Sequence, residues 1–552
     1  MKINFFLKKN NKLQKKLILI FFFIILFVVG SNIFHFYGIS FDEEENIDLG
    51  YVTLIYIYEV FFPLKASTID NISSLPKLSE AYYNGHGALL NTLCAYIEVF
   101  FKIEETRIQY LFRHYINFII FFIGVCFFYL IVKFKYNDWR IGILGCIFLV
   151  LSPRIFAQSF YNNKDIVFMS LYIVSLYSCV KFIYKPNIKH AIVFALTSAL
   201  ATDMRIMGIM LPILTLFFIL ILSLREKFFL KNNLFSILVF LIFTPSFIII
   251  FWPYLWPDPI INFIISFKNL AVFPLVDMMK NLYLGNYVSA TYLPWHYLFI
   301  WIAITTPILY VILFIFGFYV TSARVIKRLL NIYENKKQND LWRGKEEMID
   351  LLILFNFILP FFVVIILNST LYDGWRQLYF TYPSFLLISL YGFQKIMTKV
   401  KKRSLYKYFL ASVIIALIVN LVNMIRIHPY QYAYFNFLAG KETEKNFEAD
   451  YWGISNKQAL EHIIANYNKN VYKIYPASNI DLNLSKLIFS DFQKSKIEIV
   501  SKQTEADFII SNGRFWEGNP EADFAKIPDD FILYKEIRTN RTKLVSIYKK
   551  NF

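Results

Sequence analysis

The chain has 552 residues, of which 57% are hydrophobic and 60 are Phe, and its formal net charge is +18. This apolar content excludes an ordinary soluble protein, because the apolar runs are long enough to cross the ~30 Å hydrocarbon core of a bilayer. Lysine-rich loops of a membrane protein account for the positive charge, so nucleic acid is not expected as a partner.

Apolar runs predict about eleven transmembrane helices. The first run is too long for the apolar region of a signal peptide and lacks a small-residue cleavage site, so we expect it to remain as a signal anchor. The expected spans are 17–37, 111–132, 141–153, 166–183, 191–203, 206–223, 234–251, 297–320, 350–367, 378–394 and 408–425. The predicted fold class is therefore an all-α polytopic membrane protein with a small C-terminal soluble domain.

Basic residues alternate between the loops on the two sides. Six lysines precede the first span, seven basic residues lie in 323–347 and six lie in 395–407, whereas the opposite loops are poor in Lys and Arg. Because such residues accumulate on the cytoplasmic side, the N-terminus is expected in the cytoplasm and the tail outside it. The predicted location is the cell (inner) membrane.

Two outer loops are long, 38–110 and 252–296. The first contains the apolar stretches 51–64 and 88–101, which are expected to be helices lying in the membrane interface. The second opens with "WPYLWPDP", an aromatic segment typical of the headgroup level.

The tail, 426–552, changes to a pattern of short strands and one helix. "VYKIYPA", "KIEIV", "DFIISN" and "KLVSIYKK" read as strands, and "NKQALEHIIANY" reads as a helix. This predicts a membrane domain over 1–425 and a small extracytoplasmic α+β domain over 426–552. The four cysteines are isolated and form no CxxC pair, so no metal site, disulfide framework or cofactor is expected.

Polar residues in or beside apolar segments gather on the outer side. Charges near hydrocarbon are costly and usually functional, arginine forks grip phosphate oxygens, and a carboxylate can act as a general base. The composition therefore suits the handling of a phosphate-bearing lipid. The candidates are Asp42, Glu43, His86, Arg113, Arg154, Lys164, Asp165, Arg205, Tyr372, Asp373, Arg376 and Tyr379.

Structural roles for the same residues stay open. The acids 42–45 could be a solvated helix start, Arg113 could reach out to lipid headgroups, and Arg154 and Lys164 could be ordinary loop charges. His86 could serve packing rather than chemistry.

At these residues the sequence resembles the GT-C membrane glycosyltransferases, and especially the family 39-like protein O-mannosyltransferases and aminoarabinose transferases. Their acidic pair after the first helix is matched by Asp42-Glu43, and their arginine at the outer end of the next helix is matched by Arg113. "YNNKDIV" places Asp165 at the acid that opens a helix, and "RQLYFTYP" matches a late Arg-Tyr…Pro pattern through Arg376 and Tyr379.

The chain departs from this family in its first outer loop, where "NGHGALL" keeps His86 but lacks the two prolines of a His-Pro-Pro segment. Its tail also differs from the β-trefoil that protein mannosyltransferases insert in a central loop. These departures leave the identity of the donor and the acceptor open.

The resemblance implies a glycosyltransferase that moves a sugar from a polyprenyl-phosphate-linked donor to a glycan, lipid or protein acceptor, with inversion, in contact with membrane lipids. Asp42 would act as the base, Glu43 and Asp165 would support it, and Arg113, Lys164, Arg376, Arg154 and Arg205 would bind the donor phosphate. His86, Tyr372, Asp373 and Tyr379 would contact the substrate. The alternatives are a lipid-linked glycan polymerase or ligase, and a transporter or flippase, which should place charges near the bilayer midplane.

Overall fold

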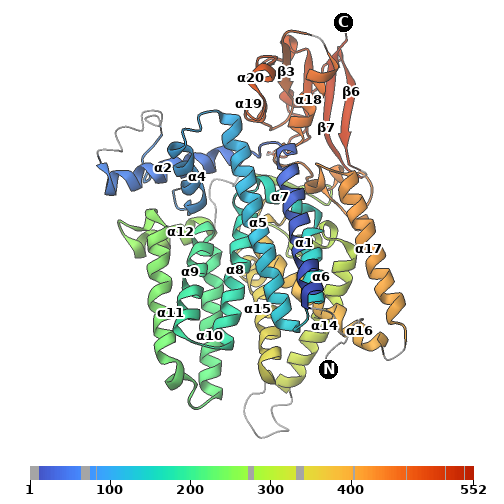
Figure 1. Cartoon of the computed structure of the whole chain (residues 1–552). Helices are drawn as coiled ribbons and strands as arrows, with labels where there is room; N and C mark the ends of the chain where they lie inside the picture. Colours follow the sequence, from blue (N-terminus) through green and yellow to red (C-terminus); the bar gives the residue numbers. More distant parts are fainter. Residues whose placement is uncertain are drawn as a thin grey trace.

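The computed structural model describes residues 12–63, 75–81, 84–271, 279–330, 341–401, 404–467, 469–515, 517–539 and 541–551. A bundle of long helices carries a small α+β unit at one end (Figure 1). The start of the first helix lies at the other end of the bundle, so the chain places its first and last elements at opposite ends.

Eight described helices are long and apolar enough to cross a membrane, and a bent pair brings this to nine. The eight are α1 (Lys12–Ile33), α5 (Thr106–Tyr136), α8 (Asp165–Tyr184), α10 (Met210–Arg225) with the preceding turn η3 (Ile206–Ile209), α11 (Phe229–Phe251), α14 (Ile308–Leu330), α15 (Gly344–Ile366) and α17 (Tyr406–Arg426). The polytopic helical architecture expected from the sequence is confirmed.

The other expected spans are helical but shorter, less apolar or broken. The runs 191–203 and 378–394 form α9 (Ile188–Met204) and α16 (Tyr382–Lys401), which fall short of the length or apolar content of the eight. The run 141–153 is α6 (Trp139–Val150), which meets α7 (Pro153–Tyr161) at 70°. The expected span 297–320 is interrupted between α13 (Tyr297–Thr305) and α14, at a proline that lacks the backbone N–H for a continuous helix.

The bundle is held by close packing of apolar faces. α8 is the most deeply buried of the apolar spans. α14 and α16 approach closely where Gly317 faces Gly392: a Cβ on Gly317 would lie 2.1 Å from the carbonyl oxygen of Ile388, so a side chain there would force the helices apart.

Short elements cover the end of the bundle that carries the α+β unit. α2 (Glu43–Phe61) and α4 (Leu89–Phe100) form the helices expected in the first outer loop, and α2 runs crosswise to the bundle (Figure 1). α12 (Pro259–Ala271) and the hairpin of β1 (Lys280–Tyr283) and β2 (Asn286–Ser289) come from the second outer loop. The turn η7 (Arg376–Thr381) precedes α16.

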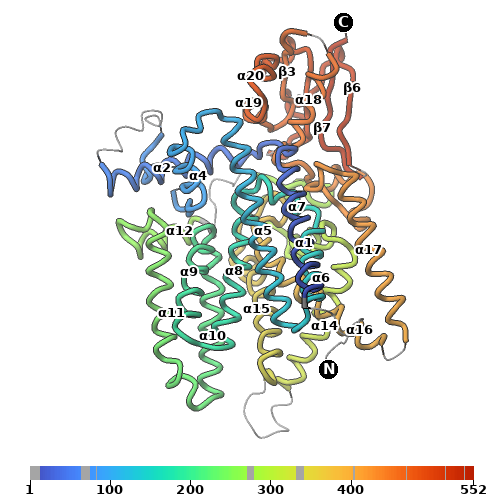
Figure 2. The backbone as a smooth tube through the Cα atoms, viewed as in Figure 1, coloured from blue at the N-terminus to red at the C-terminus, as the bar shows by residue number. Residues whose placement is uncertain are grey.

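The tail forms a five-stranded sheet in the order β4-β3-β5-β7-β6. β3 (Tyr472–Pro476) pairs in parallel with β4 (Ile497–Ile499) and β5 (Phe508–Ser511), and β7 (Lys543–Lys550) pairs antiparallel with β5 and β6 (Phe531–Arg538). The helices are α18 (Asn456–Asn466), α19 (Leu482–Lys486) and α20 (Asp491–Lys494). The four expected strands and the helix are present; β6 was not expected. Figure 2 follows the backbone from α17 into this sheet.

Candidate active site

Arg376 is the centre of a charged network at the end of the bundle. Its Nη1 lies 3.0 Å from Oδ2 of Asp165, and its Nη2 lies 3.2 Å from Oδ2 of Asp42 and 3.3 Å from Oδ2 of Asp373. The Arg376 side chain is 2% exposed. Three carboxylates from three distant parts of the sequence thus converge on one guanidinium.

The network continues from Asp165 toward a second arginine. The other oxygen of Asp165 pairs with Nη2 of Arg205, and Asn162 donates to Asp165 from the preceding turn. Lys164 lies beside this pair: burial, and then the positive charge of Arg205, lowers the pKa of the Lys164 amine to about 7. Asp165 therefore pairs with both Arg205 and Arg376, and Lys164 lies beside them.

On its other side the network reaches the tail. Arg514, just after β5, donates from Nη2 to Oδ1 of Asp373 at 2.8 Å, and its Nη1 pairs with Glu448. Burial raises the pKa of the Asp373 carboxyl in spite of Arg514 and Arg376, and burial raises the pKa of Glu448 to about 7. These groups are enclosed between the tail and the bundle.

Asp42 is the most accessible acid of this network, with 32% of its side chain exposed, against 1% for Asp165 and 5% for Asp373. It precedes the first turn of α2. The guanidinium that it contacts lies 4.8 Å from the ring centres of both Tyr372 and Trp452. Two aromatic faces therefore restrict the guanidinium, which in turn positions the exposed carboxylate.

The structure gives Arg113 and Glu43 different partners. Arg113 is held by both carboxylate oxygens of Glu98, at 2.7 and 2.6 Å, and the pair is buried. Glu43 contacts Nε2 of His114 at 2.9 Å and accepts from the backbone N–H of Ser40 at 2.6 Å. The first pair joins α5 to α4, and the second joins the start of α2 to α5; neither contains a residue of the Arg376 network.

Two further expected site residues also have structural contacts. Arg154 donates to the carbonyl oxygen of Tyr434 at 3.0 Å and lies over the ring of Phe435. The hydroxyl of Tyr379 accepts from Gln158 at 3.1 Å. Arg154 therefore fastens the segment after α17 to the bundle.

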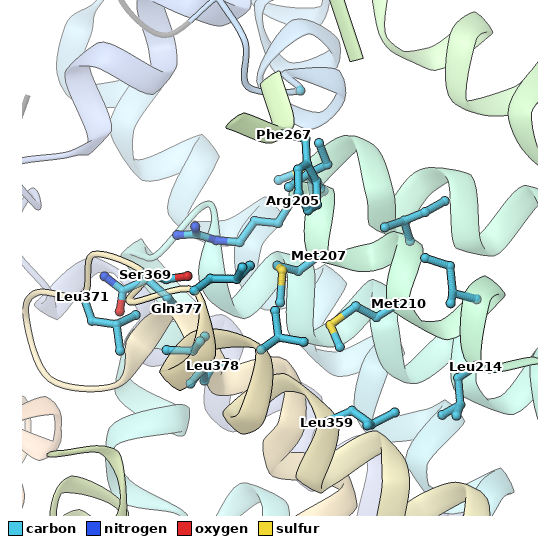
Figure 3. Close-up of a pocket in the computed structure, with 18 of the residues that line it drawn as sticks. Arg205, Met207, Met210, Leu214, Phe267, Leu359, Ser369, Leu371, Gln377 and Leu378 are labelled. Atoms are coloured by element: carbon cyan, nitrogen blue, oxygen red, sulfur yellow. The ribbon is translucent and has the colours of Figure 1, made fainter. Parts of the chain in front are cut away.

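An apolar cavity of about 600 Å³ opens beside the network, between α10 and α15 (Figure 3). Met210, Leu214 and Leu359 line its apolar length, and Arg205 and Gln377 stand at its polar end. His86 lines it as well, and burial, with the charges of Lys164 and Arg205, holds the pKa of His86 well below its usual value. One cavity thus joins apolar walls to the cationic end of the network.

Sequence reasoning missed Arg514, Glu448, Trp452 and Glu98. Arg514 lies three residues after the end of β5, which pairs in parallel with β3. The ends of parallel strands commonly carry binding residues, so its position was a usable signal. Glu98 is a lone acid in an apolar helix, which implies a buried cationic partner. Nothing in the local sequence marks the pairing of Glu448 with Arg514.

Comparison with known proteins identifies a matching family over part of the chain. Residues 95–252 match the family model described as dolichyl-phosphate-mannose-protein mannosyltransferase. Among curated proteins, none matches the chain.

Solved structures with a similar course of the chain include ArnT from Cupriavidus metallidurans bound to undecaprenyl phosphate, at 10% identity and a TM-score of 0.43, covering 97% of this chain and 98% of that one. The apo state of the same protein matches at 11% identity and a TM-score of 0.43, covering 95% of this chain and 97% of that one. The Archaeoglobus fulgidus oligosaccharyltransferase in complex with Zn and sulfate matches at 11% identity and a TM-score of 0.38, covering 84% of this chain and 65% of that one. The resemblance expected from the sequence is confirmed by the family match: over residues 95–252 the chain is similar to the dolichyl-phosphate-mannose-protein mannosyltransferases.

Proposed function

We propose that the protein is a membrane glycosyltransferase that moves a sugar from a polyprenyl-phosphate-linked donor to an acceptor hydroxyl at the extracytoplasmic face. The observation that carries this proposal is the apolar cavity whose polar end is formed by Arg205 and adjoins the network around Arg376. An amphiphile with an isoprenoid chain and a phosphate fits such a site. The family match over 95–252, to enzymes named for a dolichyl-phosphate donor, supports the same chemistry.

The donor would place its isoprenoid chain along Met210, Leu214 and Leu359 and its phosphate near Arg205 and Lys164. Guanidinium forks suit phosphate oxygens, and cations placed where charge develops stabilise a leaving phosphate. We leave Arg113 out of the donor site because Glu98 accepts from its guanidinium. We leave Arg154 out because its Nε donates to the Tyr434 carbonyl and its guanidinium lies over the Phe435 ring.

Asp42 would act as the general base. Its carboxylate would take the proton of the acceptor hydroxyl while the acceptor oxygen bonds to the anomeric carbon. The bond from that carbon to the phosphate oxygen would break, and the electron pair would leave with the lipid phosphate beside Arg205 and Lys164. A single displacement of this kind inverts the anomeric carbon.

The orientation follows from charge. Among the loops that connect the spans, those at the end of the bundle opposite the Arg376 network are richer in basic residues, and such loops usually remain in the cytoplasm. The network, the α+β unit and the cavity mouth would then face outward, where a membrane-embedded donor meets envelope acceptors.

The proposal is tested with the full chain reconstituted in sealed lipid vesicles and supplied with a polyprenyl-phosphate hexose labelled in the sugar. We expect free polyprenyl phosphate to appear, together with labelled acceptor or labelled free sugar. Movement of the intact donor between leaflets without cleavage would contradict a transferase and support a flippase.

A further inference from the structure

A second, more open groove lies on the tail where the parallel strands end. Its volume is about 330 Å³. Asn479, Asp481 and Asn483, from the segment after β3, line it together with Phe524. Parallel sheets commonly bind ligands at the carboxyl ends of their strands. One lining residue comes from outside the tail: it is Phe41, the residue next to Asp42.

The tail holds the segment that leads to Phe41 in place. From α18, Lys457 donates to the carbonyl oxygen of His35, and Gln458 donates to that of Phe36 at 2.8 Å. The chain then passes so close to the tail that a Cβ on Gly38 would lie 2.6 Å from the carbonyl oxygen of Ile454. A ligand in the groove would therefore be fixed relative to the backbone that carries Asp42.

The groove lining combines apolar rings with amide and carboxylate groups. Phe41 and the 38%-exposed Phe524 offer ring faces, and Asn479, Asn483 and Asp481 offer hydrogen-bonding groups. Rings bind the apolar face of a sugar, while amides and carboxylates bind its hydroxyls.

Acidic side chains lie near the groove. Burial, with the charges of Asp48 and Asp481, raises the pKa of the Glu44 carboxyl, which places these three acids in one electrostatic neighbourhood. Acids disfavour a phosphorylated or carboxylated ligand by like-charge repulsion. A neutral or amine-bearing ring is compatible with the same surface.

We propose that this groove is the acceptor subsite and that it binds a non-acidic sugar ring of a glycan. The inference rests on the proposed function and gives it an acceptor class. The donor phosphate would lie on the Arg205 side of Asp42 and the acceptor sugar on the Phe41 side, so that an acceptor hydroxyl reaches the base between them.

The test uses the full chain in nanodiscs and four probes: maltotriose, a glucosamine trisaccharide, a sialylated trisaccharide and a serine-containing peptide. Binding is measured by saturation-transfer NMR without donor. We expect the neutral or the amine-bearing trisaccharide to bind. Binding of only the sialylated sugar, only the peptide or none of the probes overturns the inference.

Variants locate the binding. Phe524→Ala removes one ring, and Asp481→Asn removes charge but keeps an oxygen to accept from Leu484 N–H, as Asp481 does at 3.0 Å. Each is expected to weaken sugar binding about tenfold. The matched controls are Phe492→Ala and Asp491→Asn, at exposed positions of α20 outside the groove, which should leave binding unchanged.

Hydrolysis of the donor, in which water takes the sugar and polyprenyl phosphate is released, separates the acceptor inference from the proposed transferase. If Phe524→Ala and Asp481→Asn bind the trisaccharide like the wild type while donor cleavage continues, the acceptor inference falls and the transferase stands. If the wild type binds sugar in the groove but cleaves no donor, the transferase falls.

Discussion

Arg376 illustrates how a buried charge is kept in this protein. A lone guanidinium away from water is costly, and the three carboxylates around it offset that cost only because each lies within 3.3 Å. Two of them, Asp165 and Asp373, are shared with Arg205 and Arg514. Asp42 is shared with no other cation among the ion pairs of the described residues and remains accessible, which makes it the acid of the network best suited to meet a substrate.

The lowered pKa of Lys164 predicts pH dependence. With a pKa of about 7, the amine is charged below pH 7 and becomes neutral above it, so donor capture should weaken as pH rises from 6 to 8. Since kcat/KM reports the free enzyme, this ratio for the donor should fall across that range.

Lys164→Arg is the matched variant, because arginine stays charged throughout this range. Its kcat/KM profile should be flatter than that of the wild type between pH 6 and 8. An unchanged profile in Lys164→Arg would remove Lys164 from the donor site.

At the scale of elements, α10 and α15 form the apolar walls of the cavity. Ile213 of α10 lines it and is 59% exposed, so Ile213→Trp should occupy space in the cavity without disturbing the packed side of the helix. We expect this variant to have a KM for a long-chain donor that is about tenfold higher than that of the wild type. Its KM for a donor shortened to two or three isoprene units should rise less.

Leu220→Trp is the control for this change. Leu220 lies on α10 two turns further along, is 57% exposed and does not line the cavity. Equal effects of the two tryptophans on steady-state donor kinetics would argue against the cavity as the chain site.

The elements also show what the sequence could and could not predict. Apolar length and basic bias located the spans, because crossing hydrocarbon imposes a length. Helix α7 was not predicted, because Arg154 and Gln158 make its sequence more polar and the expected span ended at residue 153. For the site, the predicted topology placed Asp42, Asp165, Arg205 and Arg376 at one end, and the structure brings these four side chains into one network. The pairing of Arg113 with Glu98 could not be predicted, because it depends on tertiary packing that periodicity does not encode.

At the scale of the whole molecule, Arg514 couples the tail to the bundle. Arg514→Ala would leave Glu448 and Asp373 without this partner in a buried setting, which should cost about 3–5 kcal/mol. Thermal unfolding of the purified protein should therefore shift clearly downward.

Arg538→Ala tests the specificity of that effect. Arg538 is 48% exposed and pairs with Glu536 at the surface of the sheet, where such a pair contributes less than about 1 kcal/mol. A Tm for Arg514→Ala no lower than that for Arg538→Ala would show that the tail and the bundle are not coupled through this residue.

The orientation of the molecule is tested by a reporter fused after the last residue. A fluorescent protein that matures only in the cytoplasm should stay dark there, and a phosphatase that works only outside should be active, because we expect the basic loops to hold the opposite end in the cytoplasm. A bright cytoplasmic reporter would place the Arg376 network on the cytoplasmic side.

The most direct test of the account is sugar transfer by Asp42→Asn. Asparagine keeps the size of the side chain and an oxygen to accept from Arg376 but cannot take the acceptor proton, so the transfer rate should fall by about 10²–10⁴-fold at normal protein levels. Glu45→Gln, three residues on in α2 and outside the Arg376 network, should transfer at the wild-type rate. Transfer from a polyprenyl-phosphate hexose, measured side by side for the three proteins, decides the matter: a wild-type rate in Asp42→Asn would contradict the mechanism.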